Sequence, residues 1–305
     1  MPANLREIKG RIRAVGNIQR ITKTMQMIAT ARFQAMAKRA TDAQAYSQRI
    51  REVAGQLAEA MGDDAEAGHP LLSSPTPAVG RELLLVIGSD RGLCGAYNAN
   101  LVRAAATHFR SLSDDTELRL EAAGRKAVGI LKFSGRAISQ VHEQFGDKPA
   151  YADVEALAQR YIDEFVAGKY DAVRVCSTAY VSKSRQVAMV QTLLPLEPPA
   201  AQEAAAEASG GASGASGQAA AVYEFQPDPA SLLDAILPMT VKTGLFQLFS
   251  EAIVSEQLAR MVAMKAATDA AGKQRKRLKR DFNRARQTAI TTELSEIIGG
   301  AAALE

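Results

Sequence analysis

Two pieces of sequence near the end of the chain, Val254-Ser-Glu-Gln-Leu-Ala-Arg-Met261 and Leu278-Lys-Arg-Asp-Phe-Asn-Arg-Ala285, decide the fold. Their apolar residues recur at steps of three and four, and the spacing continues through Ala289. Only three helix interrupters lie between residues 229 and 298: Pro238, Gly244 and Gly272. One long helix is therefore predicted. A stripe this narrow indicates a coiled-coil seam, which needs a partner helix.

The partner helix is predicted at the other end of the chain, over about residues 3–60. Seven apolar residues there fall three or four apart: Ile8, Ile12, Val15, Ile18, Ile21, Met25 and Ile28. After Ile28 alanines dominate, which would let two helices approach closely. An Ala-rich helix packed on an ordinary core fits that part of the pattern as well. A helix of this length spans roughly 80 Å, longer than an ordinary globular domain is wide.

The middle of the chain has a different period. A Pro-containing break at 62–80 is followed by the apolar run Glu82-Leu-Leu-Leu-Val-Ile-Gly88. Further strands are predicted at 118–123, 137–141, 172–177 and 186–194, and helices at 97–111, 125–133 and 153–167. Strands and helices that alternate with short links predict a Rossmann-like α/β domain with a mainly parallel sheet.

The predicted architecture is an α/β sheet domain inserted between the two helices of a long antiparallel coiled coil. Its parts are an N-terminal coiled-coil helix (1–60), the α/β domain (78–197) and a C-terminal coiled-coil helix (229–298). Residues 198–222 consist largely of Ala, Gly, Ser, Glu and Gln, and predict a flexible loop. Asp228 is predicted to cap the last helix, with Pro229 at its first position.

Composition excludes several classes of protein. The chain has 305 residues, of which 47% are hydrophobic and 23% charged, enough for one core and an extension. No run approaches 18 consecutive apolar residues, and no signal-peptide core follows Met1, so a soluble protein is expected. Two cysteines and three histidines make a disulfide framework or a dedicated zinc site an unfavourable interpretation, and a reducing compartment is expected.

Positive charge is concentrated in the two helices. The first 58 residues hold eleven Lys/Arg against three acids, and residues 273–286 hold eight against Asp281 alone. Clustered cations can neutralise phosphates, so nucleic-acid binding is one reading of the run Lys273–Arg280. The run lacks interleaved aromatic residues, which favours a solvated or partner-facing helix surface instead.

The turn Ser89-Asp-Arg-Gly-Leu-Cys-Gly95 follows a strand, where open α/β sheets bind ligands. It has neither the dinucleotide nor the P-loop glycine spacing, so no phosphate cradle is specified. Cys94 has no identifiable His partner, and a buried thiol is the simpler interpretation. Asp90 and Arg91 are compatible with a local ion pair or with a contact to a partner. No carboxylate pair, metal cluster or catalytic triad is recognisable.

Four motifs resemble the gamma subunit of F-type ATP synthase of the bacterial type. They are Ile21-Thr-Lys-Thr-Met25 with the following Met27-Ile-Ala, the turn Ser89–Gly95, and the C-terminal pair Ser255–Asp269 and Ala285–Ala301. In that family the terminal helices form the antiparallel central shaft inside the hexamer of alpha and beta subunits. The sheet domain lies at the foot of the shaft, near the epsilon subunit and the ring of c subunits in the membrane.

The resemblance implies a non-catalytic rotor. Ion flow turns the c ring, and the shaft drives the beta subunits of the proton-transporting ATPase through their nucleotide states. No cofactor, metal or nucleic acid is implied, and the chain would be a peripheral protein on the cytoplasmic side of the cell inner membrane. The contacts that carry over from the family motifs face the alpha-beta hexamer: Lys23, Met25, Arg91, Arg286, Gln287, Thr291 and Glu293.

Three features depart from the family pattern: the low-complexity loop at 200–220, Pro238, and the strongly basic run 273–280. Pro238 is expected to start or kink the last helix, so that its foot begins later than usual. Two rival functions remain at this stage. A nucleic-acid-binding coiled-coil protein would explain the basic helices, and an α/β enzyme would explain the sheet, but neither explains the motifs at both ends.

Overall fold

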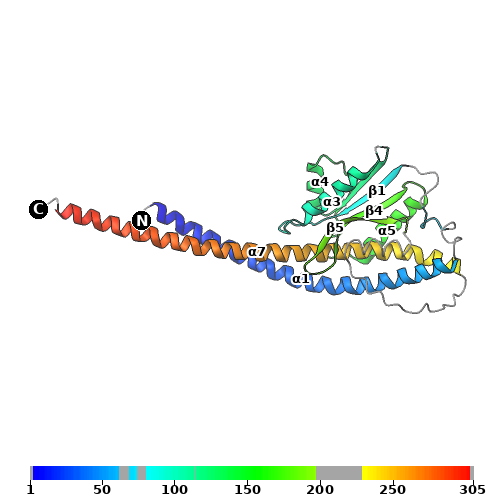
Figure 1. Ribbon diagram of the computed structural model, residues 1–305, viewed down its shortest axis with the longest axis horizontal. Coiled ribbons are helices and arrows are strands. Elements are labelled where there is room, and N and C mark those ends of the chain that lie inside the picture. The colour runs from blue at the N-terminus through cyan, green and yellow to red at the C-terminus, as the bar shows by residue number, and fades with distance from the viewer. Residues whose placement is uncertain (1–2, 62–68, 74–79, 114, 197–228, 303–305) are drawn as a thin grey trace. The chain divides into compact units, whose positions relative to one another are not determined.

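The computed structural model describes residues 3–61, 69–73, 80–113, 115–196 and 229–302 (Figure 1). Two compact units are present: residues 1–31 with 260–305 form the first, and residues 32–259 form the second. Helices α1 (Ala3–Met61) and α7 (Pro229–Ala302) each contribute to both units. The predicted loop at 198–222 lies outside the described residues.

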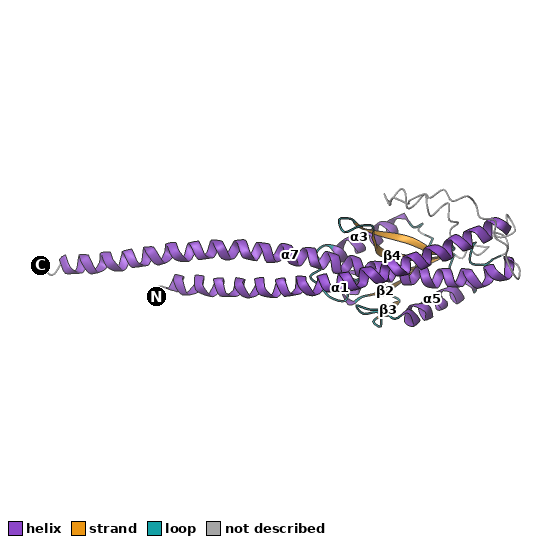
Figure 2. Cartoon of the chain, turned by 90° about the horizontal axis from the view of Figure 1, so that it is seen from below, coloured by secondary structure: helices purple, strands orange, loops and turns teal. Residues whose placement is uncertain are grey.

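In the first unit, the beginning of α1 runs antiparallel beside the end of α7 (Figure 2). The buried and half-buried positions alternate in steps of three and four on both helices, which is the seam of a coiled coil. On α1 they include Leu5, Ile8, Ile12, Val15, Gln19, Thr22, Gln26 and Ala29. On α7 they include Met264, Thr268, Ala271, Leu278, Phe282, Ala285 and Ala289.

The predicted seam of α1 is wrong at Ile18, Ile21 and Ile28. Ile18, Ile21 and Ile28 are 52%, 59% and 50% exposed, whereas Gln19 and Thr22 turn inward. The apolar residues advance by two three-residue steps in a row after Val15, which rotates their stripe away from the contact line. The helix pair keeps its alternating spacing, because an average of 3.5 residues holds a seam against the partner.

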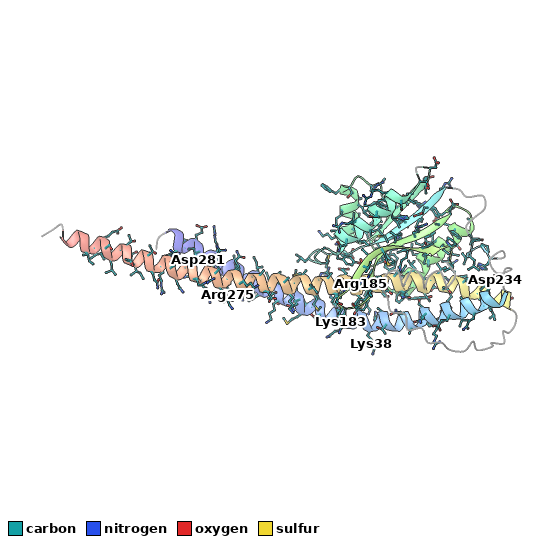
Figure 3. All side chains as sticks on the ribbon, in the orientation of Figure 1. Lys38, Lys183, Arg185, Asp234, Arg275 and Asp281 are labelled. Carbon is teal, nitrogen blue, oxygen red and sulfur yellow. The ribbon has the colours of Figure 1, made fainter. Side chains whose placement is uncertain are left out.

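The centre of the seam is consequently polar. The hydroxyl oxygens of Thr22 and Thr268 lie 2.8 Å apart, and Arg275 donates a hydrogen bond of 3.4 Å to Gln19 Oε1. Figure 3 shows Arg275 and Asp281 projecting from α7. A Cβ atom on Gly272 would lie 3.1 Å from Gln19 Nε2, so the glycine leaves room for the amide. Polar seam layers fix register at some cost in stability.

The position of the seam can be tested with two isoleucines of α1. Ile12→Ala is expected to lower the free energy of unfolding of the helix pair by about 2 kcal/mol, the low end for a core isoleucine, because Ile12 is half-buried. Ile21→Ala removes the same atoms from an exposed position and should change it by less than about 0.5 kcal/mol. Thermal unfolding of the full chain, followed by helical circular dichroism, measures both. Equal losses of stability in the two variants would contradict the assignment of Ile12 to the seam and of Ile21 to the exposed surface.

The second unit is built on a five-stranded sheet with the order β3-β2-β1-β4-β5, in which only β5 is antiparallel to its neighbour. The strands are β1 (Arg81–Ile87), β2 (Glu117–Ala123), β3 (Gln140–His142), β4 (Ala172–Tyr180) and β5 (Gln186–Leu194). The intervening helices are α3 (Tyr97–Ser111), α4 (Arg125–Phe133) and α5 (Tyr151–Val166). Together with the two long helices, this sheet confirms the predicted fold class.

Alternate residues of β1 enter two separate cores, as the two-residue period of a strand requires. Leu84 and Val86 pack with residues of α3 and α4. Leu83 and Leu85 pack on the other face with residues of α5, α7 and the end of α1. Because helices cover both faces, the strand is apolar from Leu83 to Ile87 and its hydrophobicity does not alternate there.

Pro238 does not start the last helix, since α7 begins at Pro229 and continues through Pro238. Pro238 removes one backbone donor, but the flanking turns bury Leu233, Leu237 and Val241 in the core of the second unit. Residues 252–258 are all buried as well. The start of α7 is therefore a core helix with a broad apolar face, and only its later part has a narrow seam.

Candidate partner-binding site

The turn after β1 is fixed by a compact set of hydrogen bonds. The Asn98 side chain accepts from the Ser89 amide (3.1 Å) and donates to Ser89 Oγ (2.7 Å). Ser89 Oγ donates to the carbonyl of Arg91 (2.9 Å), and the Lys126 amide donates to the Ser89 carbonyl (2.9 Å). These bonds join the turn to the start of α3 and to α4, so its backbone is held on a rigid base.

The two charged residues of the turn contact segments further along the chain. Asp90 Oδ1 accepts a hydrogen bond from the Arg125 amide at the start of α4 (3.1 Å). Arg91 Nη1 lies 3.8 Å from Asp147 Oδ2, and the Arg91 side chain is 63% exposed. Asp147 also forms an ion pair with Arg32 of α1. Arg91 thus combines an internal counter-ion with a surface that a partner can reach.

Leu93 has an unusual backbone conformation. Its φ is +66°, in the left-handed region that a residue with a Cβ rarely adopts, and its side chain is exposed. Such a conformation costs of order 1–3 kcal/mol and is found preferentially at functional sites. The next residue, Cys94, is buried beside Ser89 and Asn98, as expected for a structural thiol.

The carboxyl edge of the sheet contains a very small cavity. Its volume is about 10 Å³, and Gly88, Asp90, Tyr97, Asp147 and Glu256 are among the lining residues. That volume holds about one water molecule, whereas small-molecule sites measure roughly 300–1,000 Å³. Among the residues that the structure describes, no group of three or more His, Cys, Asp or Glu could hold a metal ion.

The other predicted contacts lie in the first unit. Lys23 is exposed and Met25 half-buried on α1, while Arg286, Gln287, Thr291 and Glu293 are exposed on α7. Because Thr22 faces Thr268, Met25 lies near residue 265 of α7. Thr291 is then roughly 40 Å further along the helix pair, at 1.5 Å per residue. The predicted residues therefore form two separate groups in this unit.

Glu293 lies in a groove beside the N-terminal end of α1. The groove has a volume of about 620 Å³ and is lined by Leu5 and by residues 281–296 of α7, including Thr288 and Thr292. Beyond it, α7 exposes Leu294, Ile297 and Ile298. Exposed apolar side chains on a rod are candidate contacts for a surrounding protein.

The first unit is strongly basic. Residues 1–31 and 260–305 contain sixteen Lys/Arg and six Asp/Glu, whereas the formal charge of the whole chain is only +4. Most cations of the run Lys273–Arg280 are exposed on the side of α7 away from the seam. A surface of this sign attracts acidic partners.

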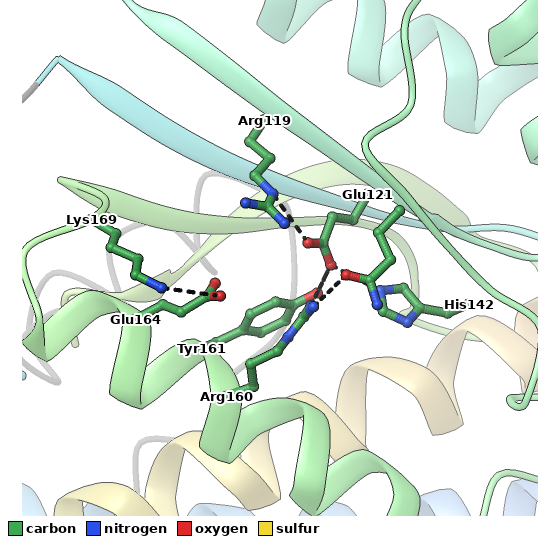
Figure 4. Close-up of polar contacts among 8 residues, drawn as sticks. Arg119, Glu121, His142, Arg160, Tyr161, Glu164 and Lys169 are labelled. Carbon is green, nitrogen blue, oxygen red and sulfur yellow. Dashed lines mark hydrogen bonds and ion pairs between the residues drawn. The ribbon is translucent and has the colours of Figure 1, made fainter.

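Glu121 forms a buried polar network in the second unit (Figure 4). Its Oε2 accepts hydrogen bonds from His142 Nε2 (2.8 Å), Arg160 Nη2 (2.5 Å) and the Tyr161 hydroxyl (2.9 Å). Burial alone would raise the pKa of the Glu121 carboxyl, but the His142 hydrogen bond and the Arg160 charge outweigh it and hold the pKa below its usual value. The network joins β2, β3 and α5.

Sequence reasoning missed Asp147, Arg32 and the Glu121 network. One signal was available for Asp147: it follows β3 in the sequence Phe145-Gly-Asp-Lys-Pro149, as the Ser89–Gly95 turn follows β1. The carboxyl ends of parallel strands meet at one edge of a sheet, and this rule could have placed the two loops side by side. Nothing in the sequence alone indicates that Arg32 pairs with Asp147.

One stretch of α7, Ser231–Gly299, is long and apolar enough by composition to cross a membrane. The core helix of a soluble protein passes the same test. Leu237, Val241 and Leu245 in this stretch are buried in the core of the second unit, as in such a core helix.

Comparisons with known proteins agree along the whole chain. A family model described as ATP synthase matches residues 4–304. The ATP synthase gamma chain of Rhodopirellula baltica is 42% identical over 304 residues, covering 99% of each chain, and that of Desulforudis audaxviator is 39% identical over 305 residues, covering 100% of each.

Solved structures share the fold at low sequence identity. A chain from the Euglena gracilis mitochondrial ATP synthase, in an assembly titled OSCP/F1/c-ring, matches with a TM-score of 0.65 and 16% identity, over 100% of this chain and 95% of that one. A chain from the rotor of the same enzyme matches with a TM-score of 0.60 and 14% identity, over 95% of this chain and 100% of that one. Because the family model and the curated relatives span essentially its full length, this chain belongs to the ATP synthase gamma-chain family.

Proposed function

We propose that this chain is the rotor shaft of an F-type ATP synthase and couples ion-driven rotation of the c ring to ATP synthesis or hydrolysis at the alpha-beta hexamer. The observation that carries the proposal is the match to ATP synthase gamma chains over 99% of the chain. The fold suits the role, because two helices in antiparallel contact make a thin, continuous rod that resists twisting better than one helix.

The shaft itself is a non-catalytic subunit. Its partners are the alpha and beta subunits, the epsilon subunit and the c ring, and it is membrane-associated as a peripheral part of that complex. We place it on the cytoplasmic side of the cell inner membrane. The first part of α1 and the later part of α7 supply the coiled coil, and the α/β domain lies between them in the sequence.

The contacts with the hexamer are proposed at two levels of the shaft and at the turn. Met25 and Lys23 lie beside the exposed isoleucines of α1, so a partner there meets an apolar stripe with a cation on it. Arg286, Gln287, Thr291 and Glu293 form the second level on α7. Arg91 is the contact in the turn, where the left-handed Leu93 and the exposed guanidinium support a binding role.

Assembly tests the proposal. The chain is co-expressed with the alpha and beta subunits encoded by the same genome, and the purified complex is assayed for ATP hydrolysis. We expect one copy of the chain for every three alpha-beta pairs and turnover that depends on its presence. If folded alpha and beta subunits form no complex with the chain, the proposal fails, and DNA binding at two salt concentrations becomes the next experiment, since a basic rod would bind DNA with steep salt dependence.

Charge reversal tests the proposed contacts. Arg91→Glu and Arg286→Glu in the assembled complex are each expected to lower coupled ATP synthesis by about tenfold or more, because like charge opposite an acidic partner costs more than the loss of a contact. Arg103→Glu is the matched control, since Arg103 is an exposed residue of α3 that donates a 3.0 Å hydrogen bond to Asn100 Oδ1 on the same helix. Coupled synthesis as high as in the native complex would remove Arg91 or Arg286 from the contact set.

A further inference from the structure

One carboxylate of the second unit lies between two arginines from different elements. Asp147, in the loop between β3 and α5, forms an ion pair with Arg32 of α1. The same oxygen, Oδ2, lies 3.8 Å from Arg91 Nη1 in the turn after β1. The three residues are far apart in sequence, and Asp147 is the group that joins them.

The surroundings of Asp147 strengthen the link that it makes between the turn 89–95 and α1. Its side chain is only 26% exposed, so its charge is less screened than that of a surface aspartate. The turn carrying Arg91 is anchored to α3 and α4 by the Ser89 and Asn98 hydrogen bonds. On the other side, Phe33 next to Arg32 is buried, which fixes this part of α1. The carboxylate therefore connects two rigidly held segments, the turn 89–95 and the part of α1 around Arg32.

The two ion pairs of Asp147 differ in distance and exposure. Arg32 is in direct contact with the carboxylate and its side chain is 40% exposed, whereas Arg91 is at a looser 3.8 Å and is 63% exposed. Arg91 can turn toward an acidic group of a partner while Arg32 remains paired. Removal of the carboxylate would leave two guanidinium groups near each other without their shared counter-ion, which favours separation of the turn from α1.

We propose that Asp147 is a positioning residue that ties the turn 89–95 to α1 through Arg91 and Arg32. It holds Arg91 at the place where the partner meets it, and a force applied to the turn is passed to the shaft helix. This inference rests on the proposed rotor function and adds to it a residue that acts through Arg91 and not by touching the partner.

The test uses the assembled complex of this chain with alpha and beta subunits in membranes with the c ring. Three variants are compared with the native chain: Asp147→Asn, Asp147→Glu and Glu143→Gln. Asp147→Asn removes the charge but keeps the size, and Asp147→Glu restores the charge. Glu143→Gln is the matched control, because Glu143 is an exposed acid of the same loop.

Two quantities are measured: ion-driven ATP synthesis, and deuterium uptake of peptides covering residues 88–96. We expect Asp147→Asn to lower synthesis by about threefold or more, the low end for residues coupled by direct contact, and to raise uptake in the turn. Asp147→Glu should restore both to within about twofold of native. Glu143→Gln should change neither.

The outcomes separate this inference from the rotor function. Native synthesis and native uptake in Asp147→Asn would overturn the role of Asp147 while the rotor function stands. Failure of the native chain to assemble would reject the rotor function itself. If Asp147→Asn does not assemble, Asp147→Glu decides: an active complex shows that the charge is what matters, and an inactive one overturns the proposal.

Discussion

Glu121→Gln is expected to lower the free energy of unfolding of the second unit by about 3 kcal/mol, the lower end of the range for breaking a buried ion pair. The Glu121 side chain is fully buried, and the substitution leaves the positive charge of Arg160 without its carboxylate. The cost stays at the lower end because Arg160 still reaches solvent. Thermal or denaturant unfolding of the full chain, followed by circular dichroism, measures the loss.

The pH dependence of this effect has a defined sign. The folded-state pKa of Glu121 lies below its ordinary value of 4.5, so its ionised form stabilises the fold. That contribution is complete above about pH 4.5 and is lost as the pH falls through the lower, folded-state pKa. The difference between the native chain and Glu121→Gln should therefore be constant near neutral pH and shrink in acid. A difference that grew below pH 4.5 would contradict this account.

Glu117→Gln is the matched control on the same strand. Glu117 pairs with Arg81 at 3.3 Å, but the two side chains are 79% and 49% exposed. Exposed pairs contribute little, so the change should stay within about 0.5 kcal/mol. Equal losses of unfolding free energy in the two variants would mean that the buried network stabilises the fold no more than an exposed ion pair does.

Gly124→Ala is the second substitution with a large expected effect, roughly 2 to 5 kcal/mol of destabilisation. Gly124 links β2 to α4 with φ +95°, where a Cβ is strained, and an added Cβ would lie 2.3 Å from the Gly88 carbonyl oxygen. That oxygen belongs to backbone at the base of the turn 89–95, which would have to shift. The expected result is a lower unfolding temperature and faster deuterium uptake in the turn.

Gly129→Ala gives the matched control five residues later. Gly129 lies inside α4, and an added Cβ there meets nothing within 4 Å. Alanine in a helix interior is favoured over glycine by about 0.5–1 kcal/mol, so this variant should be slightly more stable than the native chain. Destabilisation by both substitutions to the same extent would show that the loss does not come from the contact with the Gly88 carbonyl.

The sequence predicted those elements whose signals are local. The helix Arg125–Phe133 and the strand Gln186–Leu194 have the predicted bounds, because turn-forming residues flank each of them. The coiled-coil architecture also followed from spacing alone. Its seam did not, because hydrophobicity indicated Ile18 and Ile21, while the packing of two helices selected Gln19 and Thr22.

Buried charges could not be predicted from the sequence for a related reason. A glutamate in a strand indicates solvent exposure, and Glu121 is buried only because His142, Arg160 and Tyr161, which lie 21 to 40 residues later, surround it. Asp147 likewise could not be identified from the sequence, because its ion-pair partner Arg32 lies 115 residues earlier. Of the candidate site, the sequence motifs supplied Arg91 and the shaft residues, and the structure added the carboxylate that holds the turn.

The pairing of the two chain ends in the first unit has a consequence for biosynthesis. Thr22 and Thr268 are 246 residues apart, so the start of α1 leaves the ribosome long before its partner helix exists. At common translation rates this delay is roughly 12 to 50 s. During it, the seam residues Ile8 and Ile12 and the off-seam Ile18 and Ile21 are all uncovered. The nascent N-terminal helix therefore exposes apolar side chains of the kind that chaperones bind, and it pairs with α7 only when synthesis is almost finished.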